Sequence, residues 1–306
     1  MTTTAITLAA LERRLREVIR DVRRDAPLSR HVAFRIGGPA DLLVIPHGAG
    51  ELHAAVTVLF AEGIRPVILG QGSNVLVGDR GVRGVVVKIG KGLDRVEIDG
   101  TRVVAEAGAG LPALALRTAR RGLAGLEFAA GIPASVGGGV VMNAGAHGHA
   151  MAEIVEAADV LTPDGERRLD REALEWGYRT TALQELPWVV TAVAMALQPG
   201  DPAAIRERLD AWLAHRGATQ PIGPPSSGCI FRNPPGDHAG RLIDLAGGKG
   251  LVVGAARVSE VHANYIINMG GATAADVRAL ADQVRGRVQE RAGITLELEV
   301  KLLGEF

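Results

Sequence analysis

A single cysteine, Cys229, is the only thiol in the 306 residues. One thiol excludes an intramolecular disulfide and any metal site built on paired cysteines. Aromatic residues are also scarce at 3%, which leaves few rings on which the bases of single-stranded nucleic acid could stack. The 34 basic residues equal the 34 acidic ones in number, so no net charge attracts nucleic acid or an anionic membrane. We therefore expect neither nucleic acid nor a membrane as a partner.

Long apolar runs are missing as well. No stretch approaches the roughly 18 apolar residues that a membrane-spanning helix needs. The first ten residues carry no basic region ahead of an apolar core, so they do not resemble a secretory signal. Apolar residues nevertheless make up 47% of the chain, enough to fill a core and to exclude intrinsic disorder. These features predict a folded, soluble, cytoplasmic protein.

Asparagine is another rare residue, with only five copies. A rare type is expected to persist where the local chemistry requires it. All five copies fall in segments that are candidates for ligand binding, the last two of them in residues 261–268: Asn74, Asn143, Asn233, Asn264 and Asn268.

Apolar periodicity predicts an α+β protein in which short strands alternate with single helices. One helix has a clear start, because Thr273 is a good N-cap ahead of an apolar face. Two segments rich in glycine or proline, 131–148 and 221–236, are expected to be loops. The predicted strands are 41–45, 66–69, 84–89, 102–106, 154–162 and 188–197, and the other predicted helices are 10–22, 49–62, 111–121 and 203–215.

The first candidate ligand segment is the turn from Gly70 to Asn74, which follows a buried strand. Its two glycines allow close approach of a ligand, and successive backbone N–H groups can bind an anion such as phosphate. A second candidate, from Gly108 to Ala113, matches the start of a dinucleotide-binding fingerprint, with Glu127 about 20 residues further on. That match leaves an NAD-dependent dehydrogenase open as an alternative.

The segment from Gly125 to Gly148 contains seven glycines in 24 residues. Such a density is expected where the backbone lies flat against a large planar ligand. His147 and His149 lie in it, but a histidine pair without carboxylate or thiol partners is weak support for a metal, and we predict no metal site.

Polar residues crowd into the segment from Pro225 to Asp244, which includes Cys229. Near the C-terminus, Leu296 to Lys301 reads as a strand that places Glu297 and Glu299 on one face. Taken alone, each of these features is also typical of packing or of a solvated surface.

Eight segments in the same order resemble the UDP-N-acetylenolpyruvoylglucosamine reductases, FAD enzymes of bacterial cell-wall synthesis. The resemblance runs from about Ser29 to Gly304, and the compact stretch after Tyr178 is similar to the shorter, type II form. The segments are 34–40, 70–79, the glycine-rich stretch to Gly148, Tyr178-Arg179, 227–234, 241–244, 262–265 and 296–300.

The resemblance implies a two-subdomain FAD-binding unit of the vanillyl-alcohol-oxidase/PCMH-like type and a C-terminal α+β substrate-binding domain. The expected boundaries are 1–92, 93–200 and 201–306. It also implies non-covalent FAD, NADPH as reductant, and UDP-N-acetylglucosamine enolpyruvate as substrate. The cofactor-binding residues would be Arg35, Gly70, Gln71, Gly72, Ser73, Asn74, Gly131, Ile132, Pro133, Ser135, Gly138, Asn143, Ala144, Gly145 and Arg241. The substrate-binding residues would be Tyr178, Ser227, Arg232, Asn233, His262 and Asn264.

The resemblance also implies three catalytic residues. Hydride from the reduced flavin reaches the outer enol carbon, and Arg179 and Glu299 stabilise the resulting enolate. Glu299 would do so as a protonated hydrogen-bond donor. Cys229 stands where most of the family has serine, and it would protonate the neighbouring carbon. A thiol suits that role, because its ordinary pKa of about 8.5 makes it a stronger acid than an alcohol.

Two further alternatives to this assignment remain. An oxidase of the same fold would react with oxygen and ignore the UDP-sugar, whereas an inactive nucleotide-binding module would hold the sugar without oxidising NADPH. The presence of Arg179, Cys229 and Glu299 together disfavours the inactive module.

Overall fold

A computed structural model describes residues 6–306, so half of the N-terminal stretch assessed above for a secretory signal lies outside the described residues. Contacts divide the chain into two compact units, each assembled from three segments. Unit 1 comprises the residues up to Arg24, Leu42–Gln71 and Gly84–Ala214. Unit 2 comprises Asp25–Asp41, Gly72–Arg83 and His215–Phe306. The three contiguous domains expected from the sequence stay a prediction.

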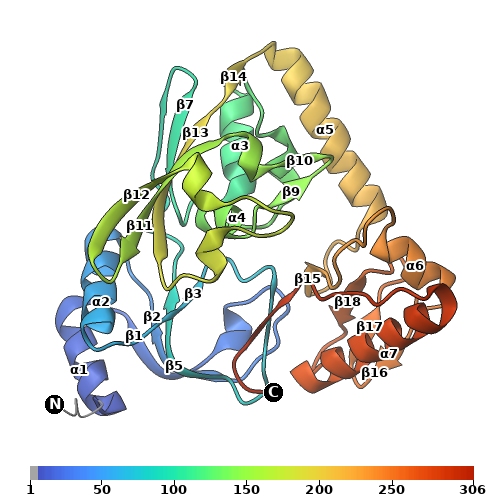
Figure 1. Ribbon diagram of the computed structural model, residues 1–306, viewed down its shortest axis with the longest axis horizontal. Helices are drawn as coiled ribbons and strands as arrows, with labels where there is room; N and C mark the ends of the chain where they lie inside the picture. Colours follow the sequence, from blue (N-terminus) through green and yellow to red (C-terminus); the bar gives the residue numbers. More distant parts are fainter. Residues whose placement is uncertain (1–5) are drawn as a thin grey trace. The chain divides into compact units, whose positions relative to one another are not determined.

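One sheet, most of whose residues belong to unit 1, has the order β1-β2-β5-β3, and the helices α1 and α2 lie side by side next to it (Figure 1). Strands β3 and β5 are parallel, with Leu69 opposite Lys88. The bounds are α1 Leu8–Val18, β1 Val22–Pro27, β2 Pro39–Val44, α2 Ala49–Ala61, β3 Val67–Leu69 and β5 Val82–Lys88. The apolar face of α1 is buried at Leu11 and Leu15, a spacing of one helical turn.

The other large sheet of unit 1 is antiparallel, in the order β12-β11-β13-β7-β6. Helix α4 packs on its strands β7 and β13 (Figure 1). The bounds are β6 Val96–Asp99, β7 Arg102–Glu106, α3 Leu111–Ala119, α4 Val136–Val141, β11 Val155–Thr162, β12 Gly165–Asp170, β13 Val189–Ala196 and α5 Pro202–Thr219. Two short pairs complete the unit: β8 Leu123–Ala124 with β14 Gln198–Pro199, and β9 Gly145–Ala146 with β10 His149–Ala150.

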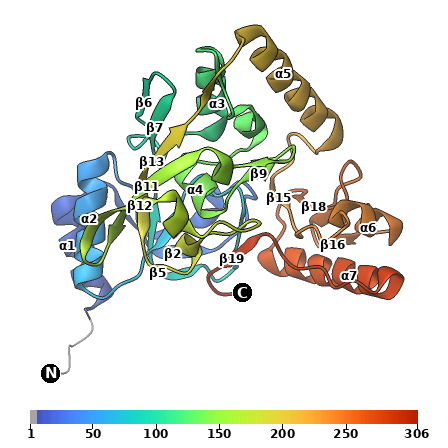
Figure 2. The same cartoon turned by 45° about the horizontal axis from the view of Figure 1, so that its top comes forward.

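Unit 2 contains an antiparallel sheet in the order β15-β18-β17-β16, against which α7 packs (Figure 2). A separate parallel pair joins β4 to β19. The bounds are β4 Val75–Val77, β15 Ser226–Cys229, α6 Ala239–Leu245, β16 Val252–Val253, β17 Ala256–Val258, β18 Tyr265–Asn268, α7 Ala274–Ala292 and β19 Lys301–Leu303. Its core takes buried residues from all three segments, among them Phe34, Leu76, Phe231 and Leu280.

The predicted start of α7 is confirmed. The Thr273 hydroxyl accepts the N–H of Asp276 at 3.0 Å, and the Asp276 carboxylate accepts the N–H of Thr273 at 3.0 Å, which makes a complete capping box. Asp79 adds a second carboxylate, which accepts the N–H groups of Ala274 and Ala275 at 2.7 and 3.0 Å. Negative charge at a helix N-terminus is stabilising, so this end of α7 is firmly anchored within unit 2.

Three secondary-structure predictions were wrong. The segment 131–148 contains helix α4, and the segment 221–236 contains strand β15. The predicted strand at 296–301 is not regular, because Glu299 and Val300 both direct their N–H groups to the carbonyl of Ile230, and β19 begins only at Lys301. Within residues 6–306, no helix is both long enough and apolar enough to span a membrane.

Candidate functional site

In unit 1, the turn that follows β3 lies beside the start of α4. A Cβ placed on Gly70 would be 2.5 Å from the hydroxyl of Ser135, so a side chain at position 70 would displace that serine. Ser135 is the N-cap of α4 and accepts the N–H of Gly138 at 3.4 Å. The fold thus brings together two predicted cofactor-binding segments that are about 65 residues apart in the sequence.

Lys88, which sequence reasoning did not select, also reaches this turn. Its amino group donates a hydrogen bond to the carbonyl of Gly70, from the strand next to β3. Burial lowers the pKa of Lys88 to about 8. The signal available in the sequence was its rarity, since the chain has only four lysines.

The glycine run in α4 permits close packing. A Cβ on Gly137 would be 2.8 Å from the Cβ of Ala107, and one on Gly139 would be 2.8 Å from the side chain of Leu111. These contacts account for two of the three glycines in this six-residue helix, despite their low helix propensity. Among the other residues predicted to bind cofactor here, Ala144 is buried, Gly131 and Ile132 are partly exposed, and Pro133 is exposed.

A tight turn carrying Tyr178 and Arg179 docks on the glycine-rich segment. Asn143 donates from Nδ2 to the carbonyl of Gly177 at 2.8 Å, and Arg179 donates from Nη1 to the carbonyl of Gly145 at 2.9 Å. Tyr178 is 55% exposed, and the Arg179 guanidinium lies 5.6 Å from the centre of its ring. The fold therefore gives Arg179 a fixed position beside the segment that was expected to lie along the flavin.

Backbone conformation is unusual at three of the predicted site residues. Arg35, Asn143 and Arg179 have φ values of +55°, +41° and +58°, a left-handed conformation that residues other than glycine rarely adopt. Such strain is concentrated at functional sites in many proteins. Here the hydrogen bonds from Asn143 and Arg179 stabilise the conformation locally.

In unit 2, the fold gathers residues from three distant parts of the chain around Cys229. The N–H of Glu299 donates to the carbonyl of Ile230 at 2.8 Å, which places Glu299 next to the strand end that carries the half-buried Cys229. Asn74 contributes its side-chain Nδ2, which donates to the carbonyl of Glu299 at 3.3 Å. Two predicted catalytic residues and one predicted cofactor residue are therefore neighbours, whereas Arg179 belongs to unit 1.

The loop after Cys229 is braced by asparagine side chains. Asn264 is buried and pairs with both backbone groups of Phe231, accepting at 2.9 Å and donating at 2.8 Å. Asn233 accepts the N–H of Ala239 at 3.0 Å, at the start of α6. These hydrogen bonds give both predicted substrate-binding residues, Asn264 and Asn233, a structural role.

Other polar groups of unit 2 remain available for a ligand. Ser227 is only 2% exposed, and its hydroxyl oxygen has no hydrogen-bond partner anywhere in residues 6–306. Because buried polar atoms are normally satisfied, such an atom points to a bound partner. Arg232 is partly exposed and lies 4.0 Å from Glu297, whose side chain is 77% exposed.

His262 packs against Tyr265, with ring centres 4.9 Å apart in an edge-to-face arrangement. Burial lowers the pKa of His262, which favours its neutral form. Tyr265 lies opposite Cys229 in the β15–β18 pair, and its hydroxyl donates to Oε1 of Gln220 at 2.8 Å. Sequence reasoning quoted Tyr265 in a motif but assigned it no role.

The remaining predicted cofactor residues of unit 2 differ in their exposure to solvent. Arg35 is exposed, Gly72 is buried, and Ser73 is partly exposed. Arg241 is exposed on α6, where it forms an ion pair with Asp237. The hydrogen bond from Arg241 is the main reason that the pKa of Asp237 falls to about 2.

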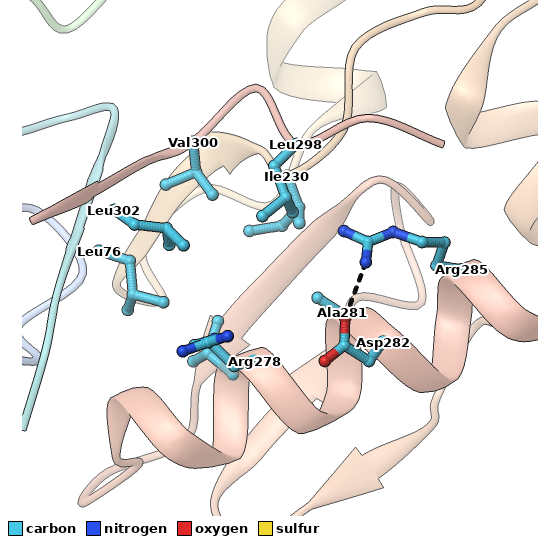
Figure 3. A pocket seen from close by; sticks show the side chains of 10 residues that line it. Leu76, Ile230, Arg278, Ala281, Asp282, Arg285, Leu298, Val300 and Leu302 are labelled. Atoms are coloured by element: carbon cyan, nitrogen blue, oxygen red, sulfur yellow. Dashed lines mark hydrogen bonds and ion pairs between the residues drawn. The ribbon is translucent and has the colours of Figure 1, made fainter. Parts of the chain in front are cut away.

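A cavity of about 130 Å³ lies between α7 and the C-terminal segment of unit 2 (Figure 3). It is lined mainly by aliphatic side chains such as Leu298, Val300 and Leu302, with Arg285 and Asp282 paired at its edge. No residue of the predicted site lines this cavity, so it is a separate feature. In residues 6–306, no cluster of three or more His, Cys, Asp or Glu is suited to a metal ion.

The alternative dinucleotide-binding motif has the wrong surroundings. Strand β7, which precedes the Gly108 loop, pairs antiparallel with both β6 and β13, whereas a dinucleotide fold requires a parallel βαβ unit. Glu127, the candidate ribose ligand, is 4% exposed and already accepts hydrogen bonds from Arg208 at 2.7 and 3.2 Å. The motif is the start of a helix and Glu127 is a structural carboxylate.

Two family models match the chain. One is described as the C-terminal domain of UDP-N-acetylenolpyruvoylglucosamine reductase and matches residues 220–303. The other is described as an FAD-binding domain and matches residues 40–169.

Similar proteins agree with these matches over nearly the whole chain. UDP-N-acetylenolpyruvoylglucosamine reductase 2 of Symbiobacterium thermophilum is 48% identical, covering 97% of this chain and 98% of that protein. The reductase of Bacillus subtilis is 43% identical, covering 91% and 92% respectively. The crystal structure of the reductase from Thermus caldophilus is similar with a TM-score of 0.80 and 37% identity, covering 92% of this chain and 98% of that one.

Proposed function

The chain belongs to the UDP-N-acetylenolpyruvoylglucosamine reductase family, and from that premise we propose how its residues carry out the reaction. It is an FAD-dependent oxidoreductase that reduces UDP-N-acetylglucosamine enolpyruvate to UDP-N-acetylmuramate for peptidoglycan synthesis. The predicted fold class, an FAD-binding unit of the PCMH-like type followed by a C-terminal α+β domain, is confirmed. NADPH as reductant, the type II form and a cytoplasmic location are part of the proposal.

The residues near the Gly70 turn fit a phosphate-bearing cofactor. Glycine leaves the turn's backbone open to a ligand, and the negative charge of a pyrophosphate would stabilise the protonated form of Lys88, which burial disfavours. We propose that the turn from Gly70 to Asn74 holds the FAD pyrophosphate and that residues 131–145 hold the flavin. When bound, FAD supplies the hydride chemistry that amino-acid side chains lack.

Arg179 is proposed to bind the carboxylate of the enolpyruvyl group. Its guanidinium is planar and permanently charged, and the hydrogen bond to Gly145 fixes its direction. A cation held in place before the reaction stabilises the negative charge that builds up on the carboxylate without needing to reorganise. Glu299 is proposed to donate a hydrogen bond to the same developing enolate.

Cys229 is proposed to protonate the α carbon. The observation that carries this assignment is the bond between Glu299 and Ile230, because it places a second predicted catalytic group next to the half-buried thiol. Ser227, with its unsatisfied buried hydroxyl, and Arg232 are proposed to bind the UDP-sugar. Tyr178, Asn233, His262 and Asn264 complete the proposed substrate-binding set.

A single-turnover experiment tests the role of Cys229. In Cys229→Ala, reduction of the flavin by NADPH should stay rapid, while reoxidation of the reduced flavin by substrate should slow by roughly 10²–10⁴, the range of one acid–base group. Cys229→Ser is the matched control, because it restores a protic side chain and should recover part of the rate. Wild-type reoxidation in Cys229→Ala would reject the assignment.

A further inference from the structure

Tyr265 and Gln220 form a polar pair behind Cys229 in unit 2. Tyr265 is 5% exposed, and its hydroxyl donates to Oε1 of Gln220 at 2.8 Å. The register of β15 and β18 sets Tyr265 directly opposite Cys229, so the two side chains leave the sheet on the same face as neighbours. A phenol has one hydrogen to donate, and here Gln220 receives it. In this state the phenol oxygen has no hydrogen left for Cys229 and can act toward it only as an acceptor.

We propose that Tyr265 and Gln220 are positioning residues that tune the acidity of Cys229. In the resting state Gln220 holds the Tyr265 hydroxyl, on the strand directly opposite the thiol. Once the thiol has lost its proton, the Tyr265 hydroxyl turns from Gln220 to the sulfur and donates to the thiolate. The inference rests on the proposed role of Cys229 and adds the group that stabilises the anion produced there.

The proton balance of the step is simple. A C–H bond forms at the α carbon of the substrate as the S–H bond of Cys229 breaks, and the S–H electron pair stays on sulfur. The O–H bond of Tyr265 stays intact and changes only its acceptor. Gln220 is partly exposed, so water can replace the lost bond to its Oε1, and water also returns the proton to the thiolate afterwards.

The charged and titratable groups around the pair favour Tyr265 as the hydrogen-bond donor to the Cys229 thiolate. Burial is the main reason that the pKa of Tyr265 is raised, and the neighbouring Cys229 and Glu299 raise it further, against the opposing charge of Arg216. Tyr265 therefore keeps its proton at neutral pH and can act as a donor. Burial also lowers the pKa of His262, the ring packed on Tyr265, and so disfavours a positive charge there.

The single cysteine makes a direct test possible, because alkylation by iodoacetamide reports on one thiolate. The rate is measured against pH in the FAD-bound enzyme. Tyr265→Phe should raise the pKa of Cys229 by about one unit, which slows alkylation about tenfold near pH 7. Gln220→Leu should lower the pKa of Cys229 and speed alkylation, because the Tyr265 hydroxyl is then released to donate to sulfur.

Ile266→Val is the matched control. It removes one buried methyl from the same strand without touching the polar pair and should leave the alkylation profile unchanged. Equal profiles for wild type and Tyr265→Phe would overturn the proposal. So would shifts of the same sign in Tyr265→Phe and Gln220→Leu, because they would indicate a general disturbance of the strand.

Flavin reoxidation by substrate separates this inference from the assignment of Cys229. Tyr265→Phe should slow that step up to about tenfold in an otherwise wild-type enzyme and have no effect in Cys229→Ala, where residue 229 forms no anion. If Cys229→Ala is fully active, the acid role fails, even if the alkylation shifts occur. If Cys229→Ala is slow and the alkylation profile of Tyr265→Phe is normal, only the role of Tyr265 fails.

Discussion

The ion pair between Arg208 on α5 and Glu127 predicts a sizeable loss of stability on Arg208→Gln. Glu127 is 4% exposed and lies in the 3₁₀ turn Glu127–Gly131, at the start of the glycine-rich segment. Arg208 gives it two hydrogen bonds, from Nη2 at 2.7 Å and from Nε at 3.2 Å. After the substitution, the buried carboxylate keeps the hydrogen bond from the N–H of Gly125 but loses both bonds from Arg208.

The expected cost follows from those contacts. A hydrogen bond to a charged group contributes about 1.5–3 kcal/mol, and an orphaned buried charge adds its desolvation penalty. Arg208 is 44% exposed, so water offsets part of the loss on its side. We expect the free energy of unfolding of unit 1 to fall by about 2–3 kcal/mol at pH 7.

The effect should depend on pH. Burial raises the pKa of Glu127, but the hydrogen bonds from Arg208 and from the N–H groups of its own turn and of Gly125 outweigh burial and hold the pKa below its usual value. A carboxylate whose pKa is lowered by folding stabilises the folded state fully above its unfolded pKa of about 4.3. That stabilisation is lost as the pH falls through the pKa of the folded state. The gap between wild type and Arg208→Gln should therefore shrink below about pH 4.5.

Urea unfolding followed by tryptophan fluorescence suits this test, because Trp176, Trp188 and Trp212 all lie in unit 1. Arg206→Gln is the matched control, since Arg206 pairs with Asp210 on the exposed face of the same helix and should give no resolvable change. Equal stabilities for the two variants, or a gap that persists unchanged in acid, would refute the reasoning.

Two other predictions concern unit 1. Because burial lowers the pKa of Lys88 to about 8, flavin-free protein should gain stability between pH 8 and about 10.4, where only the unfolded chain still binds that proton. Lys88→Met should abolish the gain in urea unfolding, and a gain that survives would show that another group is responsible. Arg179→Ala should leave flavin reduction by NADPH intact but slow reoxidation by substrate at least about 100-fold in stopped-flow absorbance. Wild-type turnover would remove Arg179 from the stabilising groups.

Strong periodicity made several elements predictable from sequence. Strand β7 was placed at its observed bounds, α2 within one residue, and the N-cap of α7 at Thr273. In these elements the local pattern and the tertiary packing agree, because one apolar face meets one core.

Amino-acid composition gave wrong predictions where contacts with a segment distant in sequence determine the structure. The glycines of α4 suggested a loop, but close contacts with Ala107 and Leu111 stabilise a helix there. Strand β15 lies in a segment rich in proline and glycine and forms because β18 pairs with it. Neither partner can be identified from the local sequence.

The five asparagines have a structural role that their scarcity in the sequence did not reveal. They were expected to mark ligand-lining segments, yet all five side chains bond to backbone groups: those of Asn74, Asn143, Asn233, Asn264 and Asn268. The amide can donate and accept at once, so it can brace a loop that has no regular ladder. The sequence alone could not distinguish bracing from ligand contact, and ligand contact at these positions stays a prediction.

The assembly of unit 2 from three segments also constrains how the protein is made. Phe34 and Leu76 belong to the core that Phe231 and α7 complete, and β4 pairs with β19, which lies at the far end of the chain. At about 5–20 residues per second, the early segments leave the ribosome roughly 10–40 s before their partners. During that interval their apolar side chains have no native core, so slow synthesis is expected to favour aggregation or chaperone binding. For the same reason, a fragment restricted to 220–303 would lack part of its own interior.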